Sequence, residues 1–266
     1  MLIIFFILGL IIGSFLNVVV YRTKVVETLL GRSHCAHCKK QIRWYDNIPL
    51  LSFILLKAKC RDCGKKISWQ YPAMELSMGI VFALIGNYFF FPPETISWVQ
   101  TLFYLIIFSL LAVIFVYDFL YMEIPMIIFW IALGVSVVYL LIFDWLSFSS
   151  SLGIFSLQTF SGILAGVIAF LIFFILVSVS KERWMGMGDA YLAFLVGLIA
   201  GWPLIIFSLS LSFGIGAIFG IILILSKKKT MKSQVPFAPF LVLGVFIALI
   251  LPQIFPMVRY LLAVYY

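Results

Sequence analysis

The chain has 266 residues, of which 65% are hydrophobic and only 11% are charged, and its mean hydropathy is +1.21. This composition lies far outside the range of ordinary soluble domains. Apolar stretches of about 18 residues or more recur along the whole length, as transmembrane helices require. These stretches do not alternate apolar with polar residues, which excludes a transmembrane β-barrel. We therefore expect an all-α polytopic membrane protein.

In chain order, the apolar stretches predict eight transmembrane helices, at residues 2–20, 73–91, 98–117, 125–143, 158–179, 189–201, 204–226 and 237–257. The first stretch has no basic region before it and no small-residue cleavage site after it. We therefore expect it to be a retained span with its amino end outside.

The sixth and seventh stretches raise the question of one helix or two. A single helix over residues 190–226 would be about 56 Å long at ~1.5 Å per residue, whereas the hydrocarbon core is only ~30 Å thick. Gly201-Trp202-Pro203 lies between the two stretches and predicts a hairpin turn. The sequence therefore favours two helices.

The basic residues support this topology. With eight spans, the cytosolic loops contain all 18 Lys and Arg residues except Arg259, as the positive-inside rule requires; these loops are 21–72, 118–124, 180–188 and 227–236. The net charge of +8 then reflects topology and attraction to a lipid bilayer with anionic headgroups. No nucleic-acid-binding motif is present, so nucleic acid is not an expected partner.

The only sizeable polar segment, residues 21–72, contains all four cysteines as two C-x2-C pairs. Such pairs are typical of a zinc ribbon, because each pair places two thiolates on one tetrahedral ion. We expect a structural Zn²⁺, since four thiolates leave no open coordination position; the ligands would be Cys35, Cys38, Cys60 and Cys63. A free or redox-active thiol set is the alternative, and His34 or His37 could replace one cysteine.

This segment divides the chain into three predicted domains. Residues 1–20 form the first transmembrane helix, residues 21–72 a small cytosolic zinc-ribbon-like domain, and residues 73–266 a seven-helix membrane domain. The middle domain is too small to bury much of a core, so metal binding would supply part of its folding free energy.

Two aspartates lie at the cytosolic ends of apolar stretches. Asp118 follows "LIIFSLLAVIFVY" and Asp189 precedes "AYLAFLVGLIAGW". Ionisable groups at such depth usually face a bundle interior or an aqueous cavity. Two adjacent carboxylates would share a proton, the arrangement that aspartic proteases use. Gly186 and Gly188 would let the backbone adopt unusual dihedrals and approach a substrate.

Some acidic residues have simpler interpretations. Asp189 could instead be a helix N-cap, and Glu182 lies between Lys181 and Arg183, where a surface role is expected.

With these features in place, the sequence resembles the type IV prepilin peptidases, membrane aspartic proteases with a G-x-G-D motif. The resemblance covers nearly the whole chain and includes the paired cysteines. Its other motifs are "GSFLNVVVYR" (13–22), "DNIPLLSF" (46–53), "ISWQYPAMEL" (67–76), "DFLYMEIP" (118–125), "GMGD" (186–189) and "VPFAPFLVLG" (235–244).

The resemblance implies a bacterial inner-membrane enzyme whose active site lies on the cytosolic side. Asp118 and Asp189 would be its catalytic pair. The substrates would be type IV prepilins and pseudopilins, cut after a glycine that ends a short basic leader. The family also commonly methylates the new amino terminus, using S-adenosylmethionine.

Three positions depart from the family pattern. Tyr191 stands where a lysine is frequent, Met126 where a polar residue usually follows "IP", and Ala36 where proline is frequent inside the first cysteine pair. None of them removes a carboxylate or a thiolate.

The sequence does not locate the methyl-donor site, because it has no Rossmann-type glycine fingerprint. Glu75, Asp46 and Asn47 are candidate contacts, although they could equally be buried caps or salt-bridge partners. Residues 21–72 carry 11 basic and 3 acidic side chains, so bulk attraction would not draw in a basic leader. We expect local contacts at acidic helix ends instead, including Glu123.

Two rival functions remain open at this point. A membrane scaffold or transporter component could use a zinc ribbon to dock a partner, and would need the cysteines but not the aspartates. Methyl transfer could also be the main activity.

Overall fold

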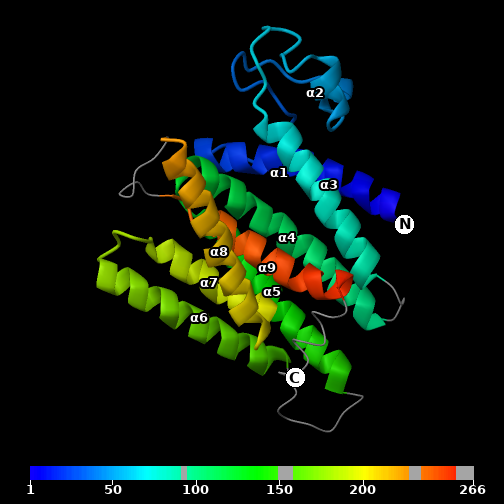
Figure 1. Cartoon of the computed structure of the whole chain (residues 1–266). Helices are drawn as coiled ribbons and strands as arrows, with labels where there is room; N and C mark the ends of the chain where they lie inside the picture. The colour runs from blue at the N-terminus through cyan, green and yellow to red at the C-terminus, as the bar shows by residue number, and fades with distance from the viewer. Residues whose placement is uncertain (91–94, 149–157, 228–234, 256–266) are drawn as a thin grey trace. The chain divides into compact units, whose positions relative to one another are not determined.

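The structure is a computed structural model that describes residues 1–90, 95–148, 158–227 and 235–255 (Figure 1). Within these ranges the regular elements are helices, accompanied by two isolated β-bridges, which confirms the predicted all-α class. The chain divides into two compact units, Met1–Pro92 and Pro93–Tyr266.

The first unit contains α1 (Leu2–Val25), the short 3₁₀ helix η1 (Trp44–Asn47), α2 (Leu51–Leu55) and α3 (Gln70–Phe89). The second contains α4 (Thr95–Tyr121), α5 (Met126–Phe148), α6 (Gln158–Ser180), α7 (Met187–Ala200), α8 (Leu204–Leu225) and α9 (Ala238–Ile254).

Each of the eight predicted stretches overlaps one of the long helices. In the part of the chain that the structure describes, six are long and apolar enough to cross a membrane, namely α1, α3, α4, α5, α6 and α8. The apolar helices α7 and α9 have 14 and 17 residues and fall short of that length. The chain is therefore a multi-pass membrane protein, and the count of eight spans stays a prediction.

Close packing of α1 against α3 forms the core of the first unit. A Cβ atom added to Gly13 would lie 2.8 Å from the Cα atom of Glu75, and one added to Gly9 would clash with the carbonyl oxygen of Met78. Small residues of this kind let two backbones approach in a membrane. Helix α3 belongs to the same compact unit as α1, and the domain boundary expected at residue 73 stays a prediction.

Helix α7 holds a central position in the second unit, because it packs against α5, α6, α8 and α9. Its side chains Leu192, Leu195 and Val196 are fully buried. Figure 1 shows α4 to α9 running side by side within this unit. A helix enclosed by neighbours in this way holds the residues of its first turn firmly in place.

The turn between α7 and α8 confirms the predicted hairpin. Gly201 has a φ of 71°, which glycine adopts without the steric cost of a Cβ atom. The backbone N–H of Trp202 donates to Ser161 Oγ at 2.8 Å, and that hydroxyl donates to the Trp202 carbonyl oxygen at 3.1 Å. These bonds attach the turn to α6.

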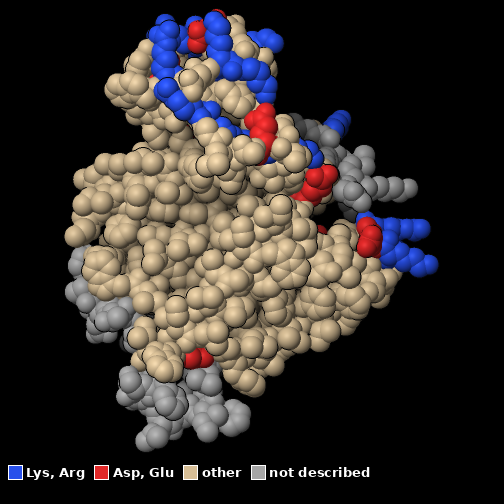
Figure 2. Space-filling view, turned by 180° about the vertical axis from the view of Figure 1, so that it is seen from behind, with Lys and Arg blue, Asp and Glu red and all other residues tan. Residues whose placement is uncertain are grey.

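The charges are unevenly distributed. Figure 2 shows Lys and Arg gathered over the cysteine-containing segment of the first unit, and helix surfaces that are almost free of charge. The segment 21–72 contains 11 of the 18 Lys and Arg residues.

Candidate functional site

The four cysteines of the first unit form one cluster. Their sulfur atoms all lie within 4.8 Å of one another, and the Sγ atoms of Cys35 and Cys63 are 4.0 Å apart. A tetrahedral zinc ion with Zn–S bonds of ~2.3 Å requires sulfur separations of about 3.8 Å. The cluster therefore could hold a metal ion with little rearrangement, and it contains neither His34 nor His37.

Each C-x2-C pair folds as the same knuckle. The N–H of Cys35 donates to the carbonyl oxygen of Lys40, and the N–H of Cys60 donates to the carbonyl oxygen of Lys65. In both cases the acceptor lies five positions further along the chain. The fourth residue after each of these cysteines, Lys39 or Gly64, has a positive φ and donates its N–H back to the cysteine carbonyl. Burial raises the pKa of Cys35, but hydrogen bonds from the backbone N–H groups of Cys38 and His37 and from the thiols of Cys38 and Cys60 outweigh it and lower this pKa to about 7.

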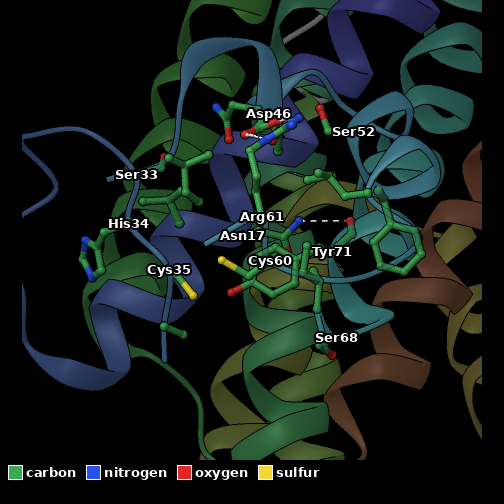
Figure 3. A pocket seen from close by; sticks show the side chains of 18 of the residues that line it. Asn17, Ser33, His34, Cys35, Asp46, Ser52, Cys60, Arg61, Ser68 and Tyr71 are labelled. Atoms are coloured by element: carbon green, nitrogen blue, oxygen red, sulfur yellow. Dashed lines mark hydrogen bonds and ion pairs between the residues drawn. The ribbon is translucent and has the colours of Figure 1, made fainter. Parts of the chain in front are cut away.

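A cavity of about 730 Å³ lies in the first unit (Figure 3). Its lining includes the three sequence candidates Asp46, Asn47 and Glu75. The aromatic side chains Phe53 and Trp69 also line it, with their rings in edge contact at 4.9 Å. A volume of this size falls within the ~300–1,000 Å³ of typical small-molecule and cofactor sites.

Two of the candidate carboxylates also have structural partners. Asp46 accepts hydrogen bonds from Arg61 Nε at 2.9 Å and from an Arg61 terminal nitrogen at 2.7 Å, and this pairing lowers the pKa of Asp46 (Figure 3). Glu75 is buried and accepts the N–H of Leu50 at 2.8 Å. The salt-bridge and buried-cap interpretations thus describe real contacts, while both side chains also line the cavity.

Two polar residues that the sequence did not single out help to build this cavity. Arg22 is only 4% exposed, and its guanidinium donates to the carbonyl oxygens of Thr28, Leu30, Gly31 and Arg32. Asn17 donates to the Tyr71 carbonyl at 3.2 Å. The signal was a polar residue within an apolar helix, and the motif "GSFLNVVVYR" contains both of these residues.

A second cavity, of about 250 Å³, lies within the second unit and is lined by both Asp118 and Asp189. The carboxylates come from the last turn of α4 and the first turn of α7. The expectation that two carboxylates 71 positions apart meet at one cavity is therefore fulfilled. The rest of the lining is Met122, Ile124, Glu182, Trp184, Met185, Gly186, Gly188, Val235, Pro236 and Phe237.

Asp118 lies in the last turn of α4, and one of its carboxylate oxygens accepts no hydrogen bond from a described residue. Helix α4 continues to Tyr121, so Asp118 lies inside the helix. The sequence prediction ended this span at residue 117 and therefore placed Asp118 in the following loop. The Asp118 carbonyl accepts the N–H of Met122, whose φ of 55° ends the helix. Asp118 is only 5% exposed, and its Oδ2 atom has no hydrogen-bond partner among the described residues.

Asp189 is the third residue of α7, and Gly186 is the N-cap. The N–H of Gly186 donates to Asp189 Oδ2 at 3.3 Å, and the N–H of Asp189 donates to the Gly186 carbonyl at 3.1 Å. The interpretation of Asp189 as the N-cap itself is therefore wrong, although its carboxylate does stabilise the helix start. This bond also fixes the carboxylate at the cavity.

The two glycines line the cavity without unusual backbone dihedrals. Gly186 has a φ of −81°, and Gly188 is not among the residues with positive φ. A Cβ atom on Gly186 would meet no protein atom within 4 Å, whereas one on Gly188 would lie 3.0 Å from Ile124 Cδ1. These positions therefore keep space open at the cavity, and the dihedral explanation is wrong.

The positions of Glu123, Glu182 and Tyr191 relative to this cavity were not all as the sequence predicted. Met122 and Ile124 line the cavity, whereas Glu123 between them does not. Glu182 lines it, although the sequence indicated a surface role. Tyr191 does not line it and stacks on Phe170 with ring centroids 6.1 Å apart.

Comparison with protein families now identifies the chain's relationships. Residues 7–89 match the bacterial peptidase A24 N-terminal domain, and residues 105–221 match the type IV leader peptidase family. A prepilin leader peptidase/N-methyltransferase of Bacillus subtilis is 32% identical over 251 residues, which cover 93% of each chain. This chain belongs to the type IV leader peptidase family.

Other members of the family are also similar to it. The enzyme of the same name from Vibrio cholerae is 34% identical over 75% of this chain and 78% of its own length. That of Stutzerimonas stutzeri is 27% identical over 92% of this chain and 88% of its own length. No solved structure matches the chain. The two family matches fall in the first and second compact units respectively.

Proposed function

We propose that this protein cleaves the leader peptides of type IV prepilins and pseudopilins and then methylates the new amino terminus. The family membership and the names of its relatives support both activities. The observation that carries the peptidase assignment is that Asp118 and Asp189, from separate helices, line one cavity.

Hydrolysis requires one proton shared between the two carboxyl groups. The ionised carboxylate takes a proton from a water molecule, whose oxygen attacks the scissile carbonyl carbon, while the protonated carboxyl donates its proton to the carbonyl oxygen. In the second step the C–N bond breaks, the leaving nitrogen takes up a proton, and the pair returns to its starting state. The two protonation roles belong to the pair, and neither is assigned to one residue.

The size of the cavity supports a peptide substrate. About 250 Å³ is below the ~300–1,000 Å³ of typical small-molecule sites. It suits a few atoms on either side of one peptide bond in an extended chain. Gly186 and Gly188 leave room for that chain to approach the aspartates.

The first unit would hold the two cofactors. The matched knuckles and the sulfur separations fit Zn²⁺ as a structural ion, which would supply folding free energy to a segment with few regular elements. The 730 Å³ cavity fits S-adenosylmethionine, which supplies the methyl group. There Asp46, Asn47 and Glu75 could accept or donate hydrogen bonds, and Phe53 and Trp69 provide aromatic surface for a base.

The distribution of basic residues supports placing the cysteine segment and the aspartates on the cytosolic side of a bacterial inner membrane. All Lys and Arg residues except Arg259 lie in the four loops assigned to that side.

The test uses the purified, zinc-loaded full chain in lipid nanodiscs with a prepilin and a labelled methyl donor. Mass spectrometry should detect a mature chain that has lost its leader and gained one methyl group. Omission of the donor should leave cleavage intact and abolish only the mass gain. An intact prepilin after incubation with folded enzyme would refute the peptidase assignment and favour the scaffold or transporter alternative.

A further inference from the structure

The loop between α6 and α7 supplies a second chemical element to the aspartate cavity. Glu182, Trp184, Met185 and Gly186 of this loop line the cavity. Glu182 is thus a third carboxylate at the cavity, and Trp184 is an aromatic ring beside it. Neither is needed for the two proton transfers of hydrolysis.

The backbone at the end of α6 holds Glu182 in position. Lys181 and Glu182 have φ values of 50° and 59°, and the N–H of Glu182 donates to the Val177 carbonyl at 3.0 Å. This bond spans five residues, as in the caps that end helices in the left-handed conformation. Non-glycine residues in that conformation cost about 1–2 kcal/mol each, so the surrounding structure defines this turn.

The side chains at this turn are available to a ligand. The Glu182 carboxylate forms no salt bridge with any described residue. This holds even for Lys181 and Arg183, its neighbours in sequence. Trp184 is 70% exposed. Lys181 and Arg183 do not line the cavity, and the charged side chains that do so among the described residues are all acidic.

A buried polar group without a partner in the described part of the chain also lies at this cavity. Asp118 is 5% exposed and lines the cavity, and its Oδ2 atom has no hydrogen-bond partner among the described residues. With one proton on the aspartate pair, the three carboxyl groups carry a charge of about −2, which favours a cation. Carboxylates and aromatic faces both bind ammonium and guanidinium groups, and Glu182 and Trp184 supply one of each to this cavity.

We propose that Glu182 and Trp184 form a subsite that binds a lysine or arginine side chain of the peptide being cut. This inference rests on the proposed peptidase function and names a specificity determinant for it. The subsite shares one small cavity with the aspartates, so the cationic residue lies close to the scissile bond.

The subsite replaces the expectation that Glu123 makes this contact. Glu123 is not part of the cavity lining, whereas both of its neighbours are. Glu123→Gln therefore serves as the matched control, because it removes the same charge from a neighbouring loop.

The experiment measures cleavage by full-length enzyme in nanodiscs. Its substrates are two prepilin peptides, one with lysines in the leader and one with those lysines replaced by methionine. Glu182→Gln should raise KM for the lysine peptide about five- to tenfold with kcat unchanged, and should leave the methionine peptide unaffected. Glu123→Gln should change neither. A leader carrying glutamate should be cut better by Glu182→Lys than by the wild type.

Trp184 provides a second, independent measurement. Trp184→Phe keeps an aromatic face and should leave KM for the lysine peptide within about twofold, whereas Trp184→Leu should raise it about threefold. Equal KM values for wild type and Glu182→Gln on the lysine peptide would overturn the subsite while leaving the peptidase function standing. A Trp184→Leu effect that is the same on both peptides would show that the indole serves membrane anchoring only.

Discussion

The two cavities of this molecule use their carboxylates differently. In the 730 Å³ cavity of the first unit, Asp46 is paired with Arg61 and Glu75 accepts the N–H of Leu50. In the 250 Å³ cavity of the second unit, Asp118 keeps an oxygen without a partner among the described residues, and Asp189 accepts a single N–H at 3.3 Å.

This difference indicates different chemistry. Both oxygens of Asp46 accept hydrogen bonds from Arg61, so this carboxylate holds its surroundings in place and presents a defined surface to a ligand. A buried carboxylate with a free oxygen is able to exchange a proton with a substrate. This contrast supports the proposal that the first cavity binds the methyl donor and that the second carries out peptide hydrolysis.

The frameworks of the two cavities differ as well. The first cavity is formed largely by a segment with only short helices, and the cysteine cluster cross-links two knuckles of that segment. The second cavity lies among the ends of helices that pack together within the second unit. Loss of metal should therefore damage one cavity far more than the other.

Apart from replacement of the catalytic aspartates, the largest predicted effect follows from removing a metal ligand. Structural zinc contributes roughly 10 kcal/mol to the folding of small domains, so Cys60→Ser should abolish zinc binding and lower methyl transfer about a hundredfold or more. Cleavage should change by less than about threefold, because no residue of the cysteine segment lines the second cavity. Metal content by elemental analysis and separate assays of the two activities test this.

His37→Asn is the matched control for metal content, because His37 flanks the first cysteine pair and is not part of the cluster. Zinc should remain bound to this variant. Equal losses of cleavage and methyl transfer in Cys60→Ser would show that the two cavities do not work independently.

A smaller and more selective effect is expected at Glu75. Glu75→Gln keeps an acceptor for the Leu50 N–H but removes the charge, so KM for the methyl donor should rise about tenfold while cleavage is unaffected. Glu75→Leu would leave the N–H unsatisfied and should cost about 1–3 kcal/mol of stability. Kinetics with the methyl donor varied, together with thermal unfolding, separate these results. If Glu75→Gln slows cleavage alone, the assignment of the first cavity is wrong.

The smallest effects concern the two glycines at the second cavity. Gly186→Ala adds a methyl group that meets no protein atom within 4 Å, so it should reduce cleavage mainly by obstructing the peptide. We expect cleavage to fall about tenfold, with a stability cost of about 1 kcal/mol or less for the changed N-cap. Gly188→Ala should cost about threefold, because the end of the Ile124 side chain is able to move aside. Unchanged cleavage in Gly186→Ala would place the substrate elsewhere.

Much of the architecture could be predicted because membrane burial imposes long apolar runs. Each predicted stretch overlaps a helix, and the Gly201 turn follows from the helix length together with the Gly-Trp-Pro sequence. The spacing of the cysteines predicted their clustering, since two C-x2-C pairs are typical ligands of one tetrahedral metal ion. The convergence of Asp118 and Asp189 followed from topology, which put both at the same membrane face.

Other features could not be predicted from the sequence, because they depend on the path of a loop or on hydrogen bonds between a side chain and a distant part of the backbone. Glu182 lies between two basic residues, a local pattern typical of a solvated surface, and only its left-handed backbone turn brings it to the cavity. Arg22 resembles an ordinary positive-inside residue, yet its guanidinium binds the carbonyls of a loop up to ten positions away. The grouping of α3 with α1 depends on helix packing, which apolar composition does not specify.

The division of labour between the two cavities is tested most directly by replacing the aspartates one at a time. Folded, zinc-loaded Asp118→Asn and Asp189→Asn should each cut a prepilin at less than about a thousandth of the wild-type rate. Both variants should still methylate a pilin that has already been cleaved. A folded variant of either kind that cuts prepilin at close to the wild-type rate would contradict the account.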